Sequence, residues 1–178
     1  MKRILALILA ASFVLPLFSC GDESDDTSQS DGSGMMYNAS LLNNPESLDP
    51  QYACDEASNT VIANLYSGLM KFADDGTAVC CNAESYSISE DGLTYTFNLR
   101  SDNYWFFDEN DDDTVDDEEC FPVTAEDYVF ALQRVLDPEM QSPYSEYFTC
   151  IKGGEAAANG TSSADSIGVY AADSSTLV

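Results

Sequence analysis

The stretch from Phe106 to Phe121 contains nine carboxylates in sixteen residues. From Asp108 onward, oxygen-bearing residues recur with the spacing of a twelve-residue calcium loop. Calcium suits such a segment because it takes about six to eight hard oxygen ligands. The ligands that this spacing predicts are Asp108, Asn110, Asp112, Thr114 through its backbone carbonyl, Asp116 and Glu119.

One position departs from the calcium pattern. Asp113 stands where the sharp turn of such a loop requires glycine, and no helix is predicted to enter the loop. Three alternatives therefore stay open: a calcium loop with a structural role, a solvated acidic loop, and a site for another metal. Without a cation, repulsion among the carboxylates would disorder the segment.

Hydrophobic periodicity predicts regular elements on both sides of the acidic stretch. In 85–100, apolar residues alternate with polar ones on each side of Asp91-Gly92, as in a half-buried hairpin. The other predictions are a strand over 35–42, a helix over 56–69 with an apolar stripe for core packing, a helix over 123–136 with Thr124 as N-cap and Asp127 three residues later, a helix after Pro143, and two strands around a turn at 173–175.

The composition excludes several classes of function. The chain has 178 residues, with 6 Lys and Arg against 32 Asp and Glu, and a net charge of -26. Such a surface repels phosphate backbones, so we expect no nucleic-acid binding. No His is present, which removes Ser-His and Cys-His nucleophile pairs and His-ligated zinc, so we do not expect an enzyme.

The N-terminus predicts export. Residues 1–19 have two basic residues, an apolar run and small residues before Cys20, the layout of a signal peptide. Leu17-Phe18-Ser19-Cys20 resembles a bacterial lipobox, which implies lipidation of Cys20 and anchoring to the outer face of the cytoplasmic membrane. The alternative is an ordinary signal peptide with an incidental cysteine. Residues 20–34 are acidic and rich in Gly and Ser, as in a flexible tether.

The remaining five cysteines leave their pairing open. An exported protein permits disulfides, but an odd number leaves at least one thiol free or bound elsewhere. Two bridges among five cysteines can be drawn in 5 × 3 = 15 ways, and a metal-thiolate cluster is the alternative. The cysteines are Cys54, Cys80, Cys81, Cys120 and Cys150.

Several motifs occur in the order found in one family. The chain resembles the solute-binding proteins of peptide ABC transporters, the oligopeptide- and dipeptide-binding family (solute-binding protein family 5), over about 140 residues. One departure is Tyr86, where the family usually has Trp. The matching motifs are Leu48-Asp49-Pro50, 65–69, Ala83 to Tyr86, 94–100, Pro122 to Asp127 and 136–144.

This resemblance implies a fold and an extent. The family has a two-lobed α/β fold of the type II periplasmic-binding-protein kind, which closes on a ligand between its lobes. Family members are about three times this length. Residues 35–178 are therefore expected to be the N-terminal part of the binding domain, including its small appended subdomain, with an insertion at 106–121.

The resemblance also implies a function and a site. We expect an extracytoplasmic protein that binds peptides and delivers them to ABC permease and ATPase subunits, with no cofactor beyond a structural Ca²⁺. The alternatives are a peptide-sensing receptor on the same fold, an acidic calcium-stabilised surface module, and a nickel, haem or sugar ligand. The residues implied to line the cleft are Ala53, Cys54, Asp55 and Glu56, for which helix capping is the competing role.

Overall fold

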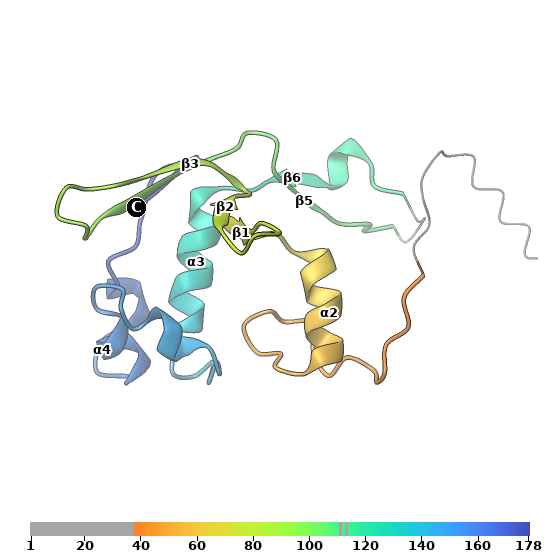
Figure 1. Cartoon of the computed structure of the whole chain (residues 1–178), viewed down its shortest axis with the longest axis horizontal. Helices are drawn as coiled ribbons and strands as arrows, with labels where there is room; N and C mark the ends of the chain where they lie inside the picture. Colours follow the sequence, from red (N-terminus) through yellow and green to blue (C-terminus); the bar gives the residue numbers. More distant parts are fainter. Residues whose placement is uncertain (1–37, 111, 113) are drawn as a thin grey trace, which may run out of the picture. The chain divides into compact units, whose positions relative to one another are not determined.

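The computed structural model describes residues 38–110, 112 and 114–178. The chain divides into two units, Met1–Ala39 and Ser40–Val178. The expected boundaries after residues 19 and 34, and the lipidation site Cys20, lie outside the described residues. The helices of the second unit are α2 (Glu56–Leu65), α3 (Ala125–Val135) and α4 (Gly154–Ala158), with 3-10 turns η1 (Asp117–Glu119), η2 (Ser145–Phe148) and η3 (Ala164–Ser166) (Figure 1).

The strands form one four-stranded sheet and two ribbons, all antiparallel. The sheet has the order β3-β4-β8-β7, so the last two strands of the chain complete a sheet begun by the central hairpin. The strands are β1 (Met70–Phe72), β2 (Ala78–Cys80), β3 (Ala83–Ile88), β4 (Tyr95–Leu99), β5 (Tyr104–Phe106), β6 (Cys120–Pro122), β7 (Ala171–Asp173) and β8 (Thr176–Leu177).

The predicted hairpin is confirmed as β3 and β4. Tyr86 lies opposite Phe97, and their rings stack with centroids 6.0 Å apart. Gly92 in the turn has a φ of 73°, which glycine adopts without steric cost. The two strands predicted around residues 173–175 are also confirmed, as β7 and β8.

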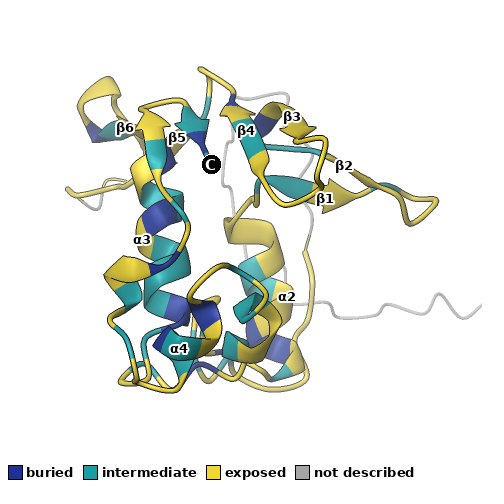
Figure 2. Cartoon of the chain, turned by 90° about the vertical axis from the view of Figure 1, so that its left-hand side faces the viewer, coloured by how far each residue is buried: buried dark blue, intermediate teal, exposed yellow. Residues whose placement is uncertain are grey.

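Helix α3 connects the two small cores of the unit. Its first half packs on the sheet, where Ala125 and Val129 are buried with Leu99 and Leu177. Its end packs on α4 and η3, in a second cluster that contains the fully buried Leu136. Figure 2 shows the buried bands along α3.

The predicted start of α3 is confirmed. Thr124 is the N-cap, and its backbone N–H donates to the Asp127 carboxylate at 2.7 Å. This is the reciprocal half of a capping box, and it satisfies a backbone donor that the helix itself leaves unpaired.

Three predicted elements differ from the structure. Residues 38–42 form no strand, and 35–37 lie outside the described residues. The helix predicted over 56–69 ends at Leu65, because the carbonyls of Gly68 and Leu69 accept backbone hydrogen bonds from Cys81, Asn82 and Ala83. The helix predicted after Pro143 is only a 3-10 turn.

The apolar stripe predicted for the first helix packs only in part. Leu65 and Tyr66 are 60% and 42% exposed, whereas the buried residues of α2 are Ala57 and Ser58. The Ser58 hydroxyl accepts hydrogen bonds from the backbone of Glu46 and Ser47, at 2.9 and 3.2 Å. The first turn of α2 is therefore fixed to the preceding chain by polar contacts.

Candidate functional site

The four residues implied to line the cleft lie at the start of α2. Ala53 is 3% exposed, whereas the thiol-bearing Cys54 and the first helical residue Glu56 are exposed. A small hollow of about 150 Å³ lies beside Asp55 and Glu56, and residues 40–43 form its other wall. Sites for small molecules have volumes of about 300–1,000 Å³. This hollow is smaller, so it is too small to enclose a whole ligand by itself.

Asp55 has the capping role that the sequence left as an alternative. It is the N-cap of α2, and its Oδ1 accepts the backbone N–H of Ser58 at 2.9 Å. Hydrogen bonds from Ser58 hold the pKa of the Asp55 carboxyl below its usual value. A contact with a ligand stays a prediction for Asp55, as it does for the other three residues.

The loop before α2, Asp49 to Ala53, is tied to the end of α3 by an ion pair. Arg134 donates to both oxygens of Asp49, at 3.1 and 2.5 Å, in a bidentate arrangement. The side chains are 34% and 29% exposed. The hydrogen bond from Arg134 lowers the pKa of Asp49, and the same bond raises the pKa of Arg134.

Gln51 joins the same network. Its side-chain oxygen accepts from Arg134 at 2.7 Å, and its side-chain nitrogen donates to the Ala131 carbonyl at 2.6 Å. Two hydroxyls then fix the backbone of the loop: Ser142 donates to the Gln51 carbonyl at 2.6 Å, and Tyr144 donates to the Ala53 carbonyl at 2.5 Å.

Sequence reasoning did not assign Arg134 or Tyr144 to the site. Arg134 is the one basic residue between Arg100 and Lys152, in a strongly acidic stretch. An isolated cation on the helix predicted over 123–136 was a usable signal for an ion pair with an acidic residue such as that of Leu48-Asp49-Pro50. Tyr144 carried no such signal.

The candidate calcium ligands lie between β5 and β6. The backbone N–H of Asp112 donates to the side-chain oxygens of Asp108 and Asn110, and Asp112 accepts from the backbone and hydroxyl of Thr114. Asp113, at the glycine position of the pattern, lies outside the described residues. The loop is folded around its own carboxylates by local hydrogen bonds.

Glu119 closes this loop. It is 7% exposed, and its two carboxylate oxygens accept the backbone N–H groups of Glu109 and Asp116, at 2.9 and 3.0 Å. Among residues 38–110, 112 and 114–178, no group of three or more His, Cys, Asp or Glu side chains is arranged to hold a metal. Calcium binding stays a prediction.

The match to known families covers more than half of the chain. Residues 80–178 match the family described as bacterial extracellular solute-binding proteins, family 5 Middle. The chain belongs to this family. The predicted resemblance is therefore confirmed, and so is the expectation of a binding protein rather than an enzyme.

Similar proteins agree with this assignment. The oligopeptide-binding protein OppA of Bacillus subtilis is 34% identical over 180 residues, which are 99% of this chain and 31% of that protein. Among solved structures, Listeria monocytogenes OppA bound to peptide is 32% identical with a TM-score of 0.64, over 74% of this chain and 24% of that one. The pheromone receptor PrgZ is 32% identical with a TM-score of 0.62, over 75% and 24%.

This family 5 chain spans between about a fifth and a third of the length of the curated relatives that it matches. The fold class predicted from the sequence, α/β and periplasmic-binding-protein-like, is confirmed for the part present. In the part that the structure describes, no helix has the length and apolar character needed to cross a membrane.

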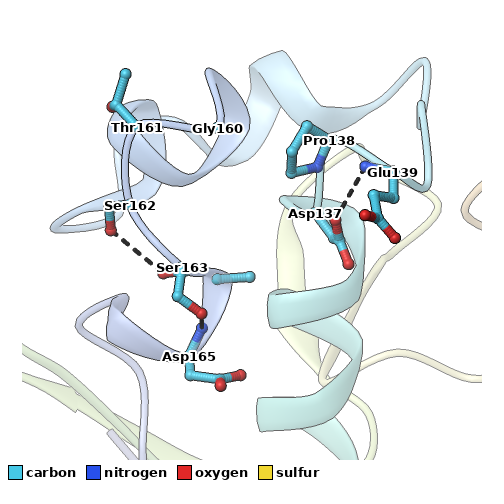
Figure 3. A pocket seen from close by; sticks show the side chains of 9 residues that line it. Asp137, Pro138, Glu139, Gly160, Thr161, Ser162, Ser163 and Asp165 are labelled. Carbon is cyan, nitrogen blue, oxygen red and sulfur yellow. Dashed lines mark hydrogen bonds between the residues drawn. The ribbon is translucent and has the colours of Figure 1, made fainter.

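A larger hollow of about 640 Å³ lies between residues 137–139, just after α3, and residues 160–165 (Figure 3), and none of its lining residues belongs to the loop before α2. It is lined by the carboxylates Asp137, Glu139 and Asp165 and by the hydroxyls of residues 161–163. The five cysteines among the described residues are all unpaired, with Cys54 and Cys150 exposed.

Proposed function

We propose that this protein captures peptides outside the cytoplasm and delivers them to an ABC importer. The observation that carries the proposal is membership of family 5 together with relatives described as oligopeptide- and dipeptide-binding proteins. Because the chain covers 31% of OppA of Bacillus subtilis, its proposed share of the function is one part of a peptide-binding domain.

The chemistry of capture requires no reaction. An extended peptide offers backbone N–H and C=O groups, which a protein can bind as it binds an added strand. Side-chain specificity can then be loose, with water filling unused space. In this chain Ala53, Cys54, Asp55 and Glu56 are the proposed contacts, and the exposed Glu56 is suited to attract a peptide ammonium group.

Two further parts of the proposal concern location and partners. Cys20 is the proposed lipid anchor, which would hold the protein at the outer face of the cytoplasmic membrane, with residues 20–34 as a tether. The permease and ATPase subunits of the importer are the proposed partners. ATP hydrolysis belongs to those subunits.

A sensing receptor is the second candidate function. The similarity to pheromone receptor PrgZ favours it, because that protein binds peptide on the same fold. Growth of a strain on an essential peptide separates the two: deletion of the gene abolishes growth if the protein imports peptides, and leaves growth unchanged if it only senses them.

We also propose that the loop from Asp108 to Glu119 binds Ca²⁺ in a structural role. The spacing of its oxygen ligands supports this, whereas the hydrogen bonds of Glu119 oppose it, because a bidentate glutamate would have to leave two backbone N–H groups. If the loop does not bind metal, the alternative function of a calcium-stabilised surface module is also contradicted.

The single tryptophan, Trp105 in β5, allows a direct test of the loop. Tb³⁺ bound nearby should emit on excitation of Trp105, and excess Ca²⁺ should displace it. Asp108→Asn with Asp112→Asn should abolish the emission, whereas Asp137→Asn with Glu139→Gln should not. Emission that both double variants reduce equally would indicate general attraction to an acidic surface and would exclude a built site.

The peptide proposal is tested by isothermal titration of the full-length mature protein, without its lipid, with a pool of random tri- to pentapeptides, in the presence and absence of Ca²⁺. Saturable heat is the expected result. Heat that does not depend on Ca²⁺ would limit the acidic loop to stability. Absence of heat from any pool would contradict peptide binding and direct the search to nickel, haem or sugars.

A further inference from the structure

We infer that Arg134 and Tyr144 are positioning residues for ligand capture, which fix the loop Asp49 to Ala53 so that the start of α2 meets a ligand in one conformation. The inference rests on the proposed function, because it concerns the same residues beside α2. It adds two residues that the sequence did not assign, from α3 and from the turn before η2.

The first tie is the guanidinium of Arg134. It donates to both oxygens of Asp49 and to the side chain of Gln51, and so fixes two residues of the loop from a helix more than 80 positions away in the sequence. A guanidinium is planar and presents a fixed set of donors, so this arrangement specifies orientation as well as distance.

The second tie acts on the backbone. Ser142 and Tyr144 donate to the carbonyls of Gln51 and Ala53, the residues on either side of Tyr52. The backbone at Tyr52 is therefore held from both sides, while Tyr52 as a residue is 55% exposed and Cys54 is exposed. Hydrogen bonds therefore hold the main chain of the loop, whereas Tyr52 and Cys54 are exposed to solvent.

The consequence for binding follows from entropy. A loop that is disordered before binding must lose conformational freedom when the ligand arrives, and the measured affinity falls by that amount. A loop already fixed by α3 and the turn before η2 avoids this loss. Loss of the hydrogen bonds that fix this loop should therefore lower peptide affinity. Loss of an ion pair of equal geometry that connects only neighbouring residues should lower it less.

The chain contains such a control. Arg100 and Asp102 also form a bidentate pair, at 2.8 and 2.6 Å, but they are two residues apart and 49% and 64% exposed. This pair joins no distant segments. Its loss should leave peptide binding unchanged.

The test uses the full-length mature protein and one synthetic tetrapeptide chosen from the pool that gives heat. Tyr144→Phe, which keeps the ring and removes the hydroxyl, and Arg134→Lys, which keeps the charge and removes the fork, should each raise Kd about tenfold. Arg100→Lys should leave Kd within about twofold. The double variant Asp49→Arg with Arg134→Asp exchanges the two charges. It should bind the tetrapeptide more tightly than either single substitution does, though less tightly than the parent.

Hydrogen exchange distinguishes positioning from general stability. In the free variants Tyr144→Phe and Arg134→Lys, the amides of 52–56 should exchange faster than in the parent, and bound peptide should restore the protection. Variants with a lower Tm but the parent Kd would overturn the inference. A parent that binds no peptide would instead contradict the proposed function, and the inference would fall with it.

Discussion

At the scale of single residues, the lowered pKa of Asp49 makes the stability of the protein depend on pH. Its hydrogen bond with Arg134 lowers the folded pKa below 3.8, so the folded state favours the ionised carboxylate. A carboxyl with a depressed folded pKa contributes stability above its unfolded pKa, and loses it as the pH falls through the folded pKa. The contribution of Asp49 should therefore be complete at pH 7 and decline below about pH 3.8.

Asp49→Asn should reduce the free energy of unfolding by about 1–2 kcal/mol at pH 7. This difference from the parent should shrink near pH 3, because the ionised Asp49 carboxylate contributes less stability as the pH falls from the unfolded pKa toward the lowered folded pKa. Urea unfolding at the two pH values measures both quantities. Asp102→Asn, in the exposed pair with Arg100, is the control and should change little. A pH-independent cost at Asp49 would show that the side chain acts by packing instead of charge.

Close packing requires glycine at position 154. A Cβ added there would lie 2.7 Å from the Phe148 carbonyl oxygen and 3.4 Å from Leu136 Cδ1. Since a backbone carbonyl cannot move aside like a flexible side chain, Gly154→Ala should destabilise the protein by about 1–3 kcal/mol. Gly92→Ala has free space but a φ of 73°, so it should cost about 1–2 kcal/mol from the backbone alone.

Thermal unfolding followed by circular dichroism compares the two glycine variants with the parent. A second change, Leu136→Val in the Gly154→Ala background, tests the cause. It gives room only on the side-chain side, so it should recover little if the contact with the carbonyl dominates. Full recovery would assign the cost to Leu136 instead.

At the scale of elements, the start of α3 depends on one reciprocal contact. Asp127 accepts both the backbone N–H and the hydroxyl of Thr124, at 2.7 and 3.1 Å. Asp127→Ala should lower the free energy of unfolding by about 1 kcal/mol, measured by urea titration. Glu126→Ala, in the same turn but exposed, should cost less than half as much. Equal costs would mean that helix-dipole charge, and not the cap, stabilises this end.

The elements predicted correctly are those specified by local sequence. Alternation and Asp91-Gly92 specify the hairpin, and Thr124 with Asp127 specifies a helix start, because each signal lies within a few residues of its effect. The first helix was predicted four residues too long, since periodicity could not reveal that Gly68 and Leu69 pair with 81–83. Non-local pairing decided that boundary.

The same distinction applies to the candidate site. The sequence placed Asp55 at a helix start, and the structure makes it the N-cap, a local role. The ties that fix the loop join Asp49 to Arg134 across 85 positions and Ala53 to Tyr144 across 91. No periodicity reports such contacts. The isolated charge of Arg134 indicated an ion pair, but only the fold could reveal its partner and the contact of Tyr144 with Ala53.

At the scale of the whole chain, large apolar side chains are widely exposed. Leu42, Phe72 and Leu93 are 90%, 81% and 81% exposed. The chain spans between about a fifth and a third of the length of its curated relatives. The family could be identified from ordered motifs, but the surfaces that meet in the complete cleft depend on sequence that the motifs do not include.

The net charge of -26 leads to the last prediction. Folding brings most of the 32 carboxylates closer together, and the described residues contain only two ion pairs to offset their repulsion. Salt screens repulsion and ion pairs alike, with a Debye length of about 10 Å at 0.1 M and about 3 Å at 1 M. Because repulsive pairs are in the majority, NaCl should stabilise the protein.

Thermal unfolding of the protein should show Tm rising by roughly 3 °C or more between about 20 mM and 500 mM NaCl. CaCl₂ and MgCl₂ at matched ionic strength separate screening from specific binding. An equal rise with both salts indicates screening alone, whereas an excess with CaCl₂ that Asp108→Asn with Asp112→Asn removes indicates a cation at the acidic loop. A Tm that falls with NaCl would mean that the two ion pairs outweigh the repulsion, and would contradict the prediction.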